Sequence, residues 1–435
     1  MSREKKLNER IEKWISIEGI SFKNEKTKEK YMASLNRFLD AVLFRKEPDR
    51  VPVFITGTFL VPYIYKLTPY EAMYDYEKVI KVHLNFLEDF DPDYAISPGS
   101  INFGKILELI GFKQYKWPGH GVPPSSVYQY VENIYMEAEE YQWLINNPSD
   151  FWLRAYLPRT CKIFEPFKTL SPFTDLWEII LYPSFFVPFG SEVFQETLMQ
   201  ISRAGREALL WTQKMREFSQ QAKAMGYPLL TGGVTKAPFD IIADTLRGTK
   251  EALLDMYRRP ELLKRALEVL TPLAISQGVR GANLSNSPIV FIPLHKGCDE
   301  FMSDAQFRTF YWPSFKNLIE GLVEEGCIPY IFAEGSFEKR LEYFRELPEK
   351  SCFIRFEKTN MEIAKKTIGD KICIAGNVPA SLIISGTPEE VRYYCKKLID
   401  TCAPGGGFIL SPGSSLDEAN PENLKVIIQV CRENL

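Results

Sequence analysis

Near the C-terminus, the chain contains two consecutive units in which a short apolar run ends in small polar residues. The first run lies in ICIAGN and ends in Gly376-Asn377, and the next helix is expected to begin at Thr387-Pro388-Glu389-Glu390. The second run, Phe408–Leu410, ends in Ser411-Pro412-Gly413-Ser414. Strands that deliver polar residues at their carboxyl ends, each followed by a helix, are typical of a (β/α)8 barrel and its active site.

The same alternation of apolar runs and helical patterns extends through most of the chain. The predicted strands are Arg50–Gly57, Asp93–Gly99, Leu229–Val234, Ile289–Leu294, Ile328–Ala333, Cys352–Phe356, Ile372–Gly376 and Gly407–Leu410. Strands that alternate with helices favour a parallel sheet with right-handed crossovers. We therefore predict an α/β fold, a (β/α)8 TIM barrel.

The regions outside this alternation divide the chain further. Residues 1–45 are expected to form an N-terminal helical extension, since Leu35, Phe38, Leu39 and Val42 recur at helical spacing. Residues 46–435 are expected to form the barrel. The aromatic, proline-rich stretch from about 137 to 191 has weak periodicity, and we predict that it is an insertion over the barrel mouth. Its aromatic residues either line a pocket for a flat substrate or pack a core.

Composition excludes several classes of function. The net charge of -3 gives no basic surplus for nucleic acid or an anionic membrane. The N-terminus is charged without an apolar core, and no run reaches the roughly 18 apolar residues of a membrane span. The 8 cysteines form no CxxC motif, which favours a reduced, cytoplasmic protein. A homodimer is left open.

The candidate catalytic residues are those that follow the predicted strands, because barrels place their chemistry there. Glu334 follows PYIFA, and it either binds a metal, acts as a base, caps the next helix or pairs with Arg355. His295 follows FIPL and either moves protons near neutral pH, ligates a metal or is structural. Lys296 either binds an anionic group or is solvated. We predict that Glu334, His295 and Arg355 are catalytic, and that a metal would use Glu334 and His295.

Further residues are assigned to substrate binding. With Lys296, they are Glu357, Asn377, Ser414, Phe332 and Asp240. His295, Glu334, Glu357, Asn377 and Ser414 are predicted to converge on one cavity. The other two histidines, His83 and His120, are interpreted as structural or exposed. The chain has no GxGxxG, Walker, HExxH or GxSxG motif, so dinucleotide or ATP chemistry is not supported.

Several segments resemble the uroporphyrinogen decarboxylase superfamily. They are the two C-terminal units, GGVTKAPFDIIADTLRG (Gly232–Gly248) and FMSDAQFRTFYWPSFKNLI (Phe301–Ile319). The likeness covers roughly residues 46–435. The superfamily contains tetrapyrrole decarboxylases and corrinoid-linked methyltransferases. The resemblance implies a distorted (β/α)8 barrel with its site at the C-terminal mouth.

The decarboxylase branch fits this chain poorly. True uroporphyrinogen decarboxylases open with RxPxWxMRQAGRYLPEY, where this chain has RVPVFITGTFLVPYIY from Arg50. The two later arginines of that pattern fall on Gly57 and Val61, and a mid-chain tyrosine of the family falls on Asp244. Glycine and valine cannot replace arginines that hold carboxylates in pairs of hydrogen bonds. A highly anionic tetrapyrrole is therefore disfavoured.

The methyltransferase branches differ in their implied zinc ligands. In the branch that serves coenzyme M, the ligands fall on Phe332, Glu334 and Ser414, none of which is the expected His or Cys. The methyl-ether-cleaving branch is more similar, in LHKG and FAEG. Its implied zinc set includes Glu334, a histidine where Arg355 stands, and a glutamate near Ile319, one residue from Glu320. The resemblance therefore implies a possible zinc site whose ligand set is incomplete in this chain.

The resemblance implies a corrinoid-linked methyltransferase, an O-demethylase component. It would move a methyl group from a small donor, a methoxylated aromatic, to the Co(I) corrinoid of a partner protein. The chain lacks a DxHxxG motif, so the corrinoid is expected on that partner. Two alternatives stay open: a decarboxylase of a porphyrinogen-like or smaller substrate, and a non-catalytic ligand-binding relative.

Overall fold

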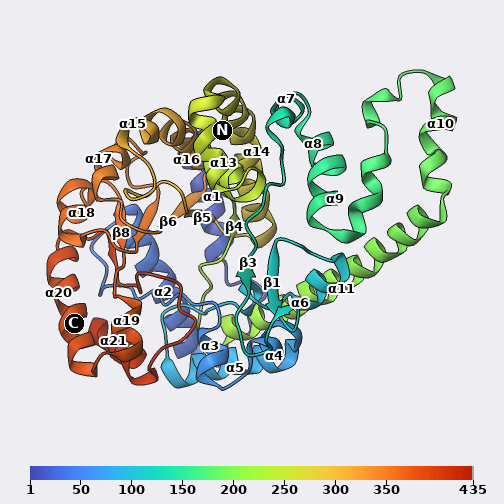
Figure 1. The fold of residues 1–435 in the computed structure, drawn as a ribbon. Helices are drawn as coiled ribbons and strands as arrows, with labels where there is room; N and C mark the ends of the chain where they lie inside the picture. Colours follow the sequence, from blue (N-terminus) through green and yellow to red (C-terminus); the bar gives the residue numbers. More distant parts are fainter. Residues whose placement is uncertain (434–435) are drawn as a thin grey trace.

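Six parallel strands form a continuous sheet in the computed structural model, which describes residues 1–433 (Figure 1). In the order in which they pair, they are β4 (Gly233–Val234), β5 (Ile289–Leu294), β6 (Ile328–Ala333), β7 (Phe353–Phe356), β8 (Cys373–Ala375) and β9 (Phe408–Ile409). All neighbouring pairs are parallel. Each lies within a strand that the sequence predicts, although β4 and β9 are shorter than expected.

Two N-terminal segments complete the barrel. Val53 forms a parallel bridge with Leu410, beyond β9, and Ala95 forms one with Leu229, before β4. Between these two segments the seam is bridged by a side chain: Asp93 pairs with Arg50 and accepts a hydrogen bond of 2.9 Å from the backbone N–H of Val53. The two segments are the first two predicted strands, and the predicted (β/α)8 barrel is confirmed.

Alternate residues of the strands face the inside and the outside of the barrel. Ile289, Tyr330 and Phe353 belong to a buried cluster inside it. Their neighbours Val290 and Ile331 belong to the larger core beneath the surrounding helices. Because side chains alternate with a period of two residues, the inner rows continue toward the residues just beyond the strand ends.

The helix α2 (Glu25–Leu43) closes the amino-terminal end of the barrel, beside α1 (Arg3–Ile15). Leu35, Phe38 and Leu39 of α2 are fully buried and belong to the same inner cluster as the first residues of β5 to β8. The ring of Phe38 meets that of Phe353 edge-on, with centroids 5.4 Å apart. The apolar stripe predicted for this segment is thus a plug for the barrel.

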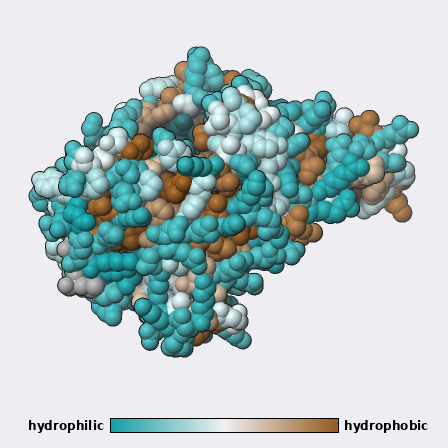
Figure 2. All heavy atoms as spheres, turned by 90° about the horizontal axis from the view of Figure 1, so that it is seen from below, coloured by the Kyte–Doolittle hydropathy of each residue, from teal (hydrophilic) through white to brown (hydrophobic). Residues whose placement is uncertain are grey.

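The stretch predicted as an insertion consists of short helices that lead to a long one, α11 (Glu192–Ala224). They are η2 (Ala138–Glu140), α7 (Tyr141–Asn146), α8 (Pro148–Phe151), η3 (Trp152–Tyr156), α9 (Leu157–Thr160), η4 (Lys162–Thr169), η5 (Phe173–Asp175), η6 (Ile179–Leu181), α10 (Tyr182–Phe186) and η7 (Val187–Gly190). Figure 1 shows α10 at the end of an arm that follows α11 away from the strands. Hydrophobic side chains gather at its end (Figure 2), where Trp177 and Ile180 are each 80% exposed. The distal part thus projects from the barrel.

The remaining elements surround the barrel. They are α3 (Leu60–Ile64), α4 (Pro69–Tyr74), α5 (Tyr76–Phe90), η1 (Pro98–Ser100), α6 (Gly104–Ile110), β1 (Tyr115–Pro118), β2 (Gly121–Val122), β3 (Gln129–Tyr130), α12 (Pro238–Asp240), η8 (Ile241–Leu246), α13 (Thr249–Arg258), α14 (Pro260–Ser285), α15 (Asp304–Gln306), η9 (Phe307–Tyr311), α16 (Trp312–Glu324), η10 (Glu338–Arg340), α17 (Leu341–Phe344), α18 (Met361–Ile368), α19 (Ala380–Ser385), α20 (Pro388–Cys402) and α21 (Pro421–Glu433). The predicted helix start at Thr387 is confirmed, since its side chain and Glu390 form a capping box.

Across residues 1–433, no helix combines the length and apolar character that crossing a membrane requires.

Candidate functional site

A cavity of about 500 Å³ lies at the carboxyl ends of the strands. Its walls are largely apolar and include Phe54, Phe291 and Tyr330 from the barrel and Trp211 and Met215 from α11. The ring centroids of Phe291 and Tyr330 are 4.8 Å apart, and those of Phe54 and Tyr330 are 5.6 Å apart. The cavity therefore offers aromatic faces to a small flat ligand.

Arg355 of β7 brings a cation to this cavity. Its side chain is fully buried, and its guanidinium lies 3.7 Å from the ring centroid of Phe332. The guanidinium donates hydrogen bonds to the hydroxyl of Thr56 and, at 3.4 Å, to that of Ser415. Burial lowers the pKa of Arg355 from its usual value. Of the three residues predicted as catalytic, Arg355 is the one that lines the cavity.

The other two predicted catalytic residues, His295 and Glu334, meet beyond the strand ends. Nε2 of His295 lies 3.7 Å from the Glu334 carboxylate, and Nδ1 lies 2.5 Å from Oδ2 of Asp244. Burial works to lower the pKa of His295, but the hydrogen bond with Asp244 and the nearby carboxylate charges outweigh it and raise that pKa. Burial raises the pKa of Glu334. Both groups are therefore biased toward holding a proton.

Two lysines complete the surroundings of Asp244. Nζ of Lys236 lies 3.0 Å, and Nζ of Lys296 3.3 Å, from its carboxylate. Burial works to raise the pKa of Asp244, but the hydrogen bond from His295 and the charge of Lys236 outweigh it and lower that pKa. Asp244 therefore stays ionised and holds His295 in place. Lys296, predicted to bind substrate, has its ammonium on this carboxylate.

Asp240 lies beneath this cluster rather than in the cavity. Its carboxylate is fully buried and accepts hydrogen bonds from the backbone N–H groups of His295 (3.0 Å) and Lys296 (3.1 Å) and from the hydroxyl of Tyr311 (2.9 Å). Burial, together with the charge of Asp244, raises the pKa of Asp240 to about 6. The predicted substrate-binding role is corrected: Asp240 positions the loop that carries His295.

The remaining predicted residues do not all meet at one cavity. Glu357 accepts a hydrogen bond of 2.6 Å from the backbone N–H of Gly335, which fixes the loop after Glu334. Ser414 is near the cavity through its carbonyl, which accepts a hydrogen bond of 3.4 Å from Thr56. Phe332 lies under Arg355. None of these three is among the residues that line the cavity, and neither are His295 and Glu334. The predicted convergence of His295, Glu334, Glu357, Asn377 and Ser414 on one cavity is therefore wrong.

Asn377 is turned away from the cavity, which corrects its predicted convergence with the other residues. Its amide donates hydrogen bonds to the carbonyls of Glu357 (3.2 Å) and Thr359 (2.9 Å). It lines a separate groove between α18 and α20. The preceding Gly376 has a φ of +117°, a conformation that favours glycine, so the inward alternation of β8 ends before Asn377.

The zinc set implied by the family resemblance does not fit these residues. Across the described 433 residues, no group of three His, Cys, Asp or Glu side chains is placed to hold a metal ion. Arg355 places a cation where the resemblance expects a histidine. Glu320 lies on α16, where its charge acts on Lys316. His295 and Glu334 thus remain as two donors without a third.

The other two histidines take no part in the site. His83 is buried in α5, where burial lowers its pKa to about 4, and its Nδ1 lies 2.7 Å from the carbonyl of Val79. His120 stacks on Trp117 with ring centroids 4.8 Å apart. The interpretation of both as structural or exposed is consistent with these contacts.

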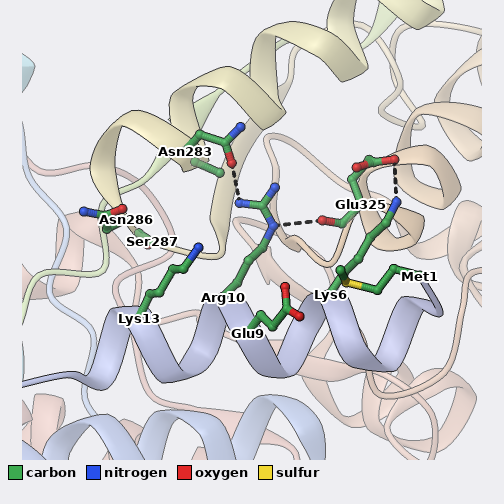
Figure 3. A pocket seen from close by; sticks show the side chains of 10 residues that line it. Met1, Lys6, Glu9, Arg10, Lys13, Asn283, Asn286, Ser287 and Glu325 are labelled. Atoms are coloured by element: carbon green, nitrogen blue, oxygen red, sulfur yellow. Dashed lines mark hydrogen bonds and ion pairs between the residues drawn. The ribbon is translucent and has the colours of Figure 1, made fainter.

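A second pocket lies between α1 and α14, at the other end of the barrel (Figure 3). Arg10 donates hydrogen bonds of 2.8 Å to the side chain of Asn283 and to the carbonyl of Glu325. Lys6 pairs with the Glu325 carboxylate at 2.8 Å. The polar groups of this pocket are thus paired with one another, and we interpret their contacts as the interactions that hold α1 to the barrel.

The comparisons with known proteins place the chain in a family. The family model described as uroporphyrinogen decarboxylase (URO-D) matches residues 217–434, half of the chain. The chain belongs to the uroporphyrinogen decarboxylase family. The resemblance seen in the sequence is confirmed.

Two curated relatives are both described as uroporphyrinogen decarboxylase. That of Chlorobium phaeobacteroides is 26% identical over 190 residues, which cover 41% of this chain and 51% of the relative. That of Pseudoalteromonas translucida is 31% identical over 75 residues, 17% of this chain and 21% of the relative. The chain thus spans about half the length of the first relative and less of the second.

A solved structure covers nearly the whole chain. A methyltransferase from Methanosarcina mazei aligns over 92% of this chain and 98% of its own, with a TM-score of 0.60 and 15% sequence identity. At this identity the likeness concerns the fold, and it agrees with the barrel described above.

Proposed function

We propose that this family member is a methyltransferase for a small methylated donor, most simply a methoxylated aromatic. The donor binds in the cavity, and its methyl group passes to a Co(I) corrinoid carried by a partner protein. The observation that carries the proposal is an aromatic-walled cavity of about 500 Å³ lined by Arg355, whose charge acts on Glu334, the neighbour of His295. When bound, the corrinoid supplies the nucleophile that accepts the methyl group.

The size and lining of the cavity favour a small donor. Pockets for small molecules typically have volumes of about 300–1,000 Å³ and mostly apolar walls. Phe54, Phe291 and Tyr330 provide faces on which an aromatic ring can pack. Such packing orients the ring and excludes water from the carbon that reacts.

The pair of His295 and Glu334 supports the second requirement of the reaction. When an aryl methyl ether loses its methyl group, the phenolic oxygen retains the bonding electrons and is stabilised by a proton. His295 keeps its proton because Asp244 accepts at Nδ1, and Nε2 faces Glu334. A positioned general acid of this kind typically contributes about 100- to 10,000-fold to the rate.

The cavity supports a porphyrinogen substrate less well. A tetrapyrrole with several carboxylates needs several cations, whereas Arg355 is the one arginine that lines the cavity among the described residues. We expect no coproporphyrinogen when uroporphyrinogen is incubated with the pure protein.

The test mixes the protein with a reduced corrinoid partner of proven competence and a panel of methylated donors. Methylated corrinoid, followed by its absorbance, is expected from methoxylated aromatics and not from buffer alone. If no donor yields methylated corrinoid, the proposal is wrong, and a ligand-binding relative becomes the better description.

A further inference from the structure

Arg355 differs from the other buried arginines because it has no carboxylate in contact among the described residues, although the charges of Glu334 and Glu357 act on it from farther away. Arg247 pairs with Asp255 at 2.8 Å, and Arg340 pairs with Asp304 at 3.2 Å. Arg355 is just as buried, yet no carboxylate within residues 1–433 lies within 4.0 Å of its guanidinium nitrogens. A buried cation is costly unless it is paired.

The hydrogen bonds of Arg355 are also incomplete. The guanidinium has five N–H donors, and its partners are the hydroxyls of Thr56 and Ser415. Its Nε is buried without a hydrogen-bond partner. One face of the group is covered by Phe332. Since Arg355 lines the cavity, the missing partner is most simply a ligand that enters there.

A second unpartnered donor lies in the wall of the same cavity. Nε1 of Trp211 is buried and has no hydrogen-bond partner, and the rest of its indole lies against the loop that carries Gly99. Phe291 and Tyr330 form apolar wall of this cavity. The cavity thus combines the cation of Arg355, the unpartnered indole N–H of Trp211 and aromatic faces.

We propose that the cavity binds an aromatic monocarboxylic acid whose carboxylate pairs with Arg355. The planar guanidinium matches a carboxylate in geometry and charge. The ring packs on Phe291 and Tyr330, and a ring oxygen remote from the carboxylate accepts from Trp211. That this acid is also the methyl donor rests on the function proposed above, whereas the binding site rests on the unpaired arginine.

The test measures binding without any corrinoid partner. Calorimetric titration of the full chain compares 4-methoxybenzoate with 4-methoxybenzamide, which has the same shape without the charge. We expect the acid to bind at least about 30-fold more tightly, in line with a desolvated ion pair. Arg355→Gln should remove this preference, whereas Arg308→Gln, an exposed arginine of η9, should leave it unchanged.

The comparison of acid and amide on the native protein needs no variant, so a misfolded variant cannot obscure the result. Equal binding of acid and amide, no binding of either, or full acid binding by folded Arg355→Gln would each overturn the inference. Binding of the acid without methyl transfer would support the site and contradict the proposed function. Methyl transfer from neutral donors with no preference for acids would support the proposed function and contradict the acid-binding site.

The fate of the bound acid separates two chemistries. A methyl donor should be recovered as the hydroxybenzoate with its carboxylate intact. Release of carbon dioxide from the acid would instead identify Arg355 as the holder of a leaving carboxylate, and the donor assignment would be wrong.

Discussion

Nδ1 of His295 lies 2.5 Å from Oδ2 of Asp244, although Asp244 belongs to η8, after β4, and His295 follows β5. The contact fixes the orientation of the imidazole and directs Nε2 toward Glu334. It also makes His295 the group whose protonation should control the pH dependence of the reaction.

Asp244→Asn should move the loss of activity at high pH to lower pH. His295 acts as an acid, so activity is present below its pKa and falls above it. The substitution removes the carboxylate that raises this pKa and leaves the charges of Lys236 and Lys296 nearby. The pH profile of methyl transfer measures the shift. Asp400→Asn, at an exposed position, is the control, and an unmoved profile for Asp244→Asn would exclude His295 as the acid.

Glu334→Gln should lower methyl transfer by roughly 100-fold or more, as for the loss of an acid–base group. Glutamine keeps the shape of the side chain but removes its titratable group beside His295. Glu338→Gln changes an exposed glutamate in the next turn and should behave as the native protein. If Glu334→Gln transfers methyl groups at the native rate, Glu334 has only a structural role in its loop.

Arg355→Met should make the protein more stable while it abolishes acid binding. Replacing a buried charged group with an apolar side chain of similar size often stabilises by about 1–4 kcal/mol. Arg340→Met is the opposite case, because it strands the buried Asp299 beside it, and should cost about 3–5 kcal/mol. Urea unfolding measures both. A destabilised Arg355→Met would mean that the bonds to Thr56 and Ser415 stabilise the fold.

Asp240→Asn should change how stability depends on pH. The pKa of Asp240 rises from 3.8 to about 6 on folding. Its protonation therefore stabilises the fold fully below about pH 3.8, and this stabilisation is lost as the pH rises through about 6. Asparagine does not titrate, so the variant does not lose stability in this way. Its deficit in free energy of unfolding should therefore shrink between about pH 4.5 and 7, by at most about 3 kcal/mol. A deficit that is constant across urea unfolding at these pH values would contradict the assignment.

Phe38→Ala should destabilise the protein by about 3–5 kcal/mol, the usual cost of truncating a buried phenylalanine. Phe38 is fully buried where α2 enters the barrel and packs against Trp14, Tyr94 and Phe353. Tyr393→Ala, at a side chain that is 73% exposed, provides the comparison by thermal unfolding. Equal melting temperatures for the two variants would show that the plug is dispensable.

The sequence predicts the strands of this barrel well because buried parallel strands are short apolar runs between amphipathic helices. It also predicts the positions of His295, Glu334 and Arg355, since each continues an inner row beyond or within its strand; their catalytic role stays a prediction. For Asp244, the sequence indicates only that it stands where the family has a tyrosine. Its role depends on how η8 packs against the residues after β5, and no local sequence pattern encodes that contact.

The residues that the sequence misplaces or misses also depend on backbone conformation and on contacts between distant elements. Asn377 follows β8 as predicted, but the conformation of Gly376 rotates it out of the inner row. Trp211 and Met215 reach the cavity from α11, a helix far from any strand end, and strand ends alone cannot reveal them. Their spacing of four residues places both on one face of a helix, and this spacing is the sequence signal that could have indicated a shared surface.

Because α2 closes the amino-terminal end of the barrel, a ligand of the cavity exchanges with solvent through the carboxyl end. If the proposed corrinoid partner docks across that end, it covers the route of exchange. The small molecule would then have to bind before the partner docks, and the product would leave only after the partner dissociates.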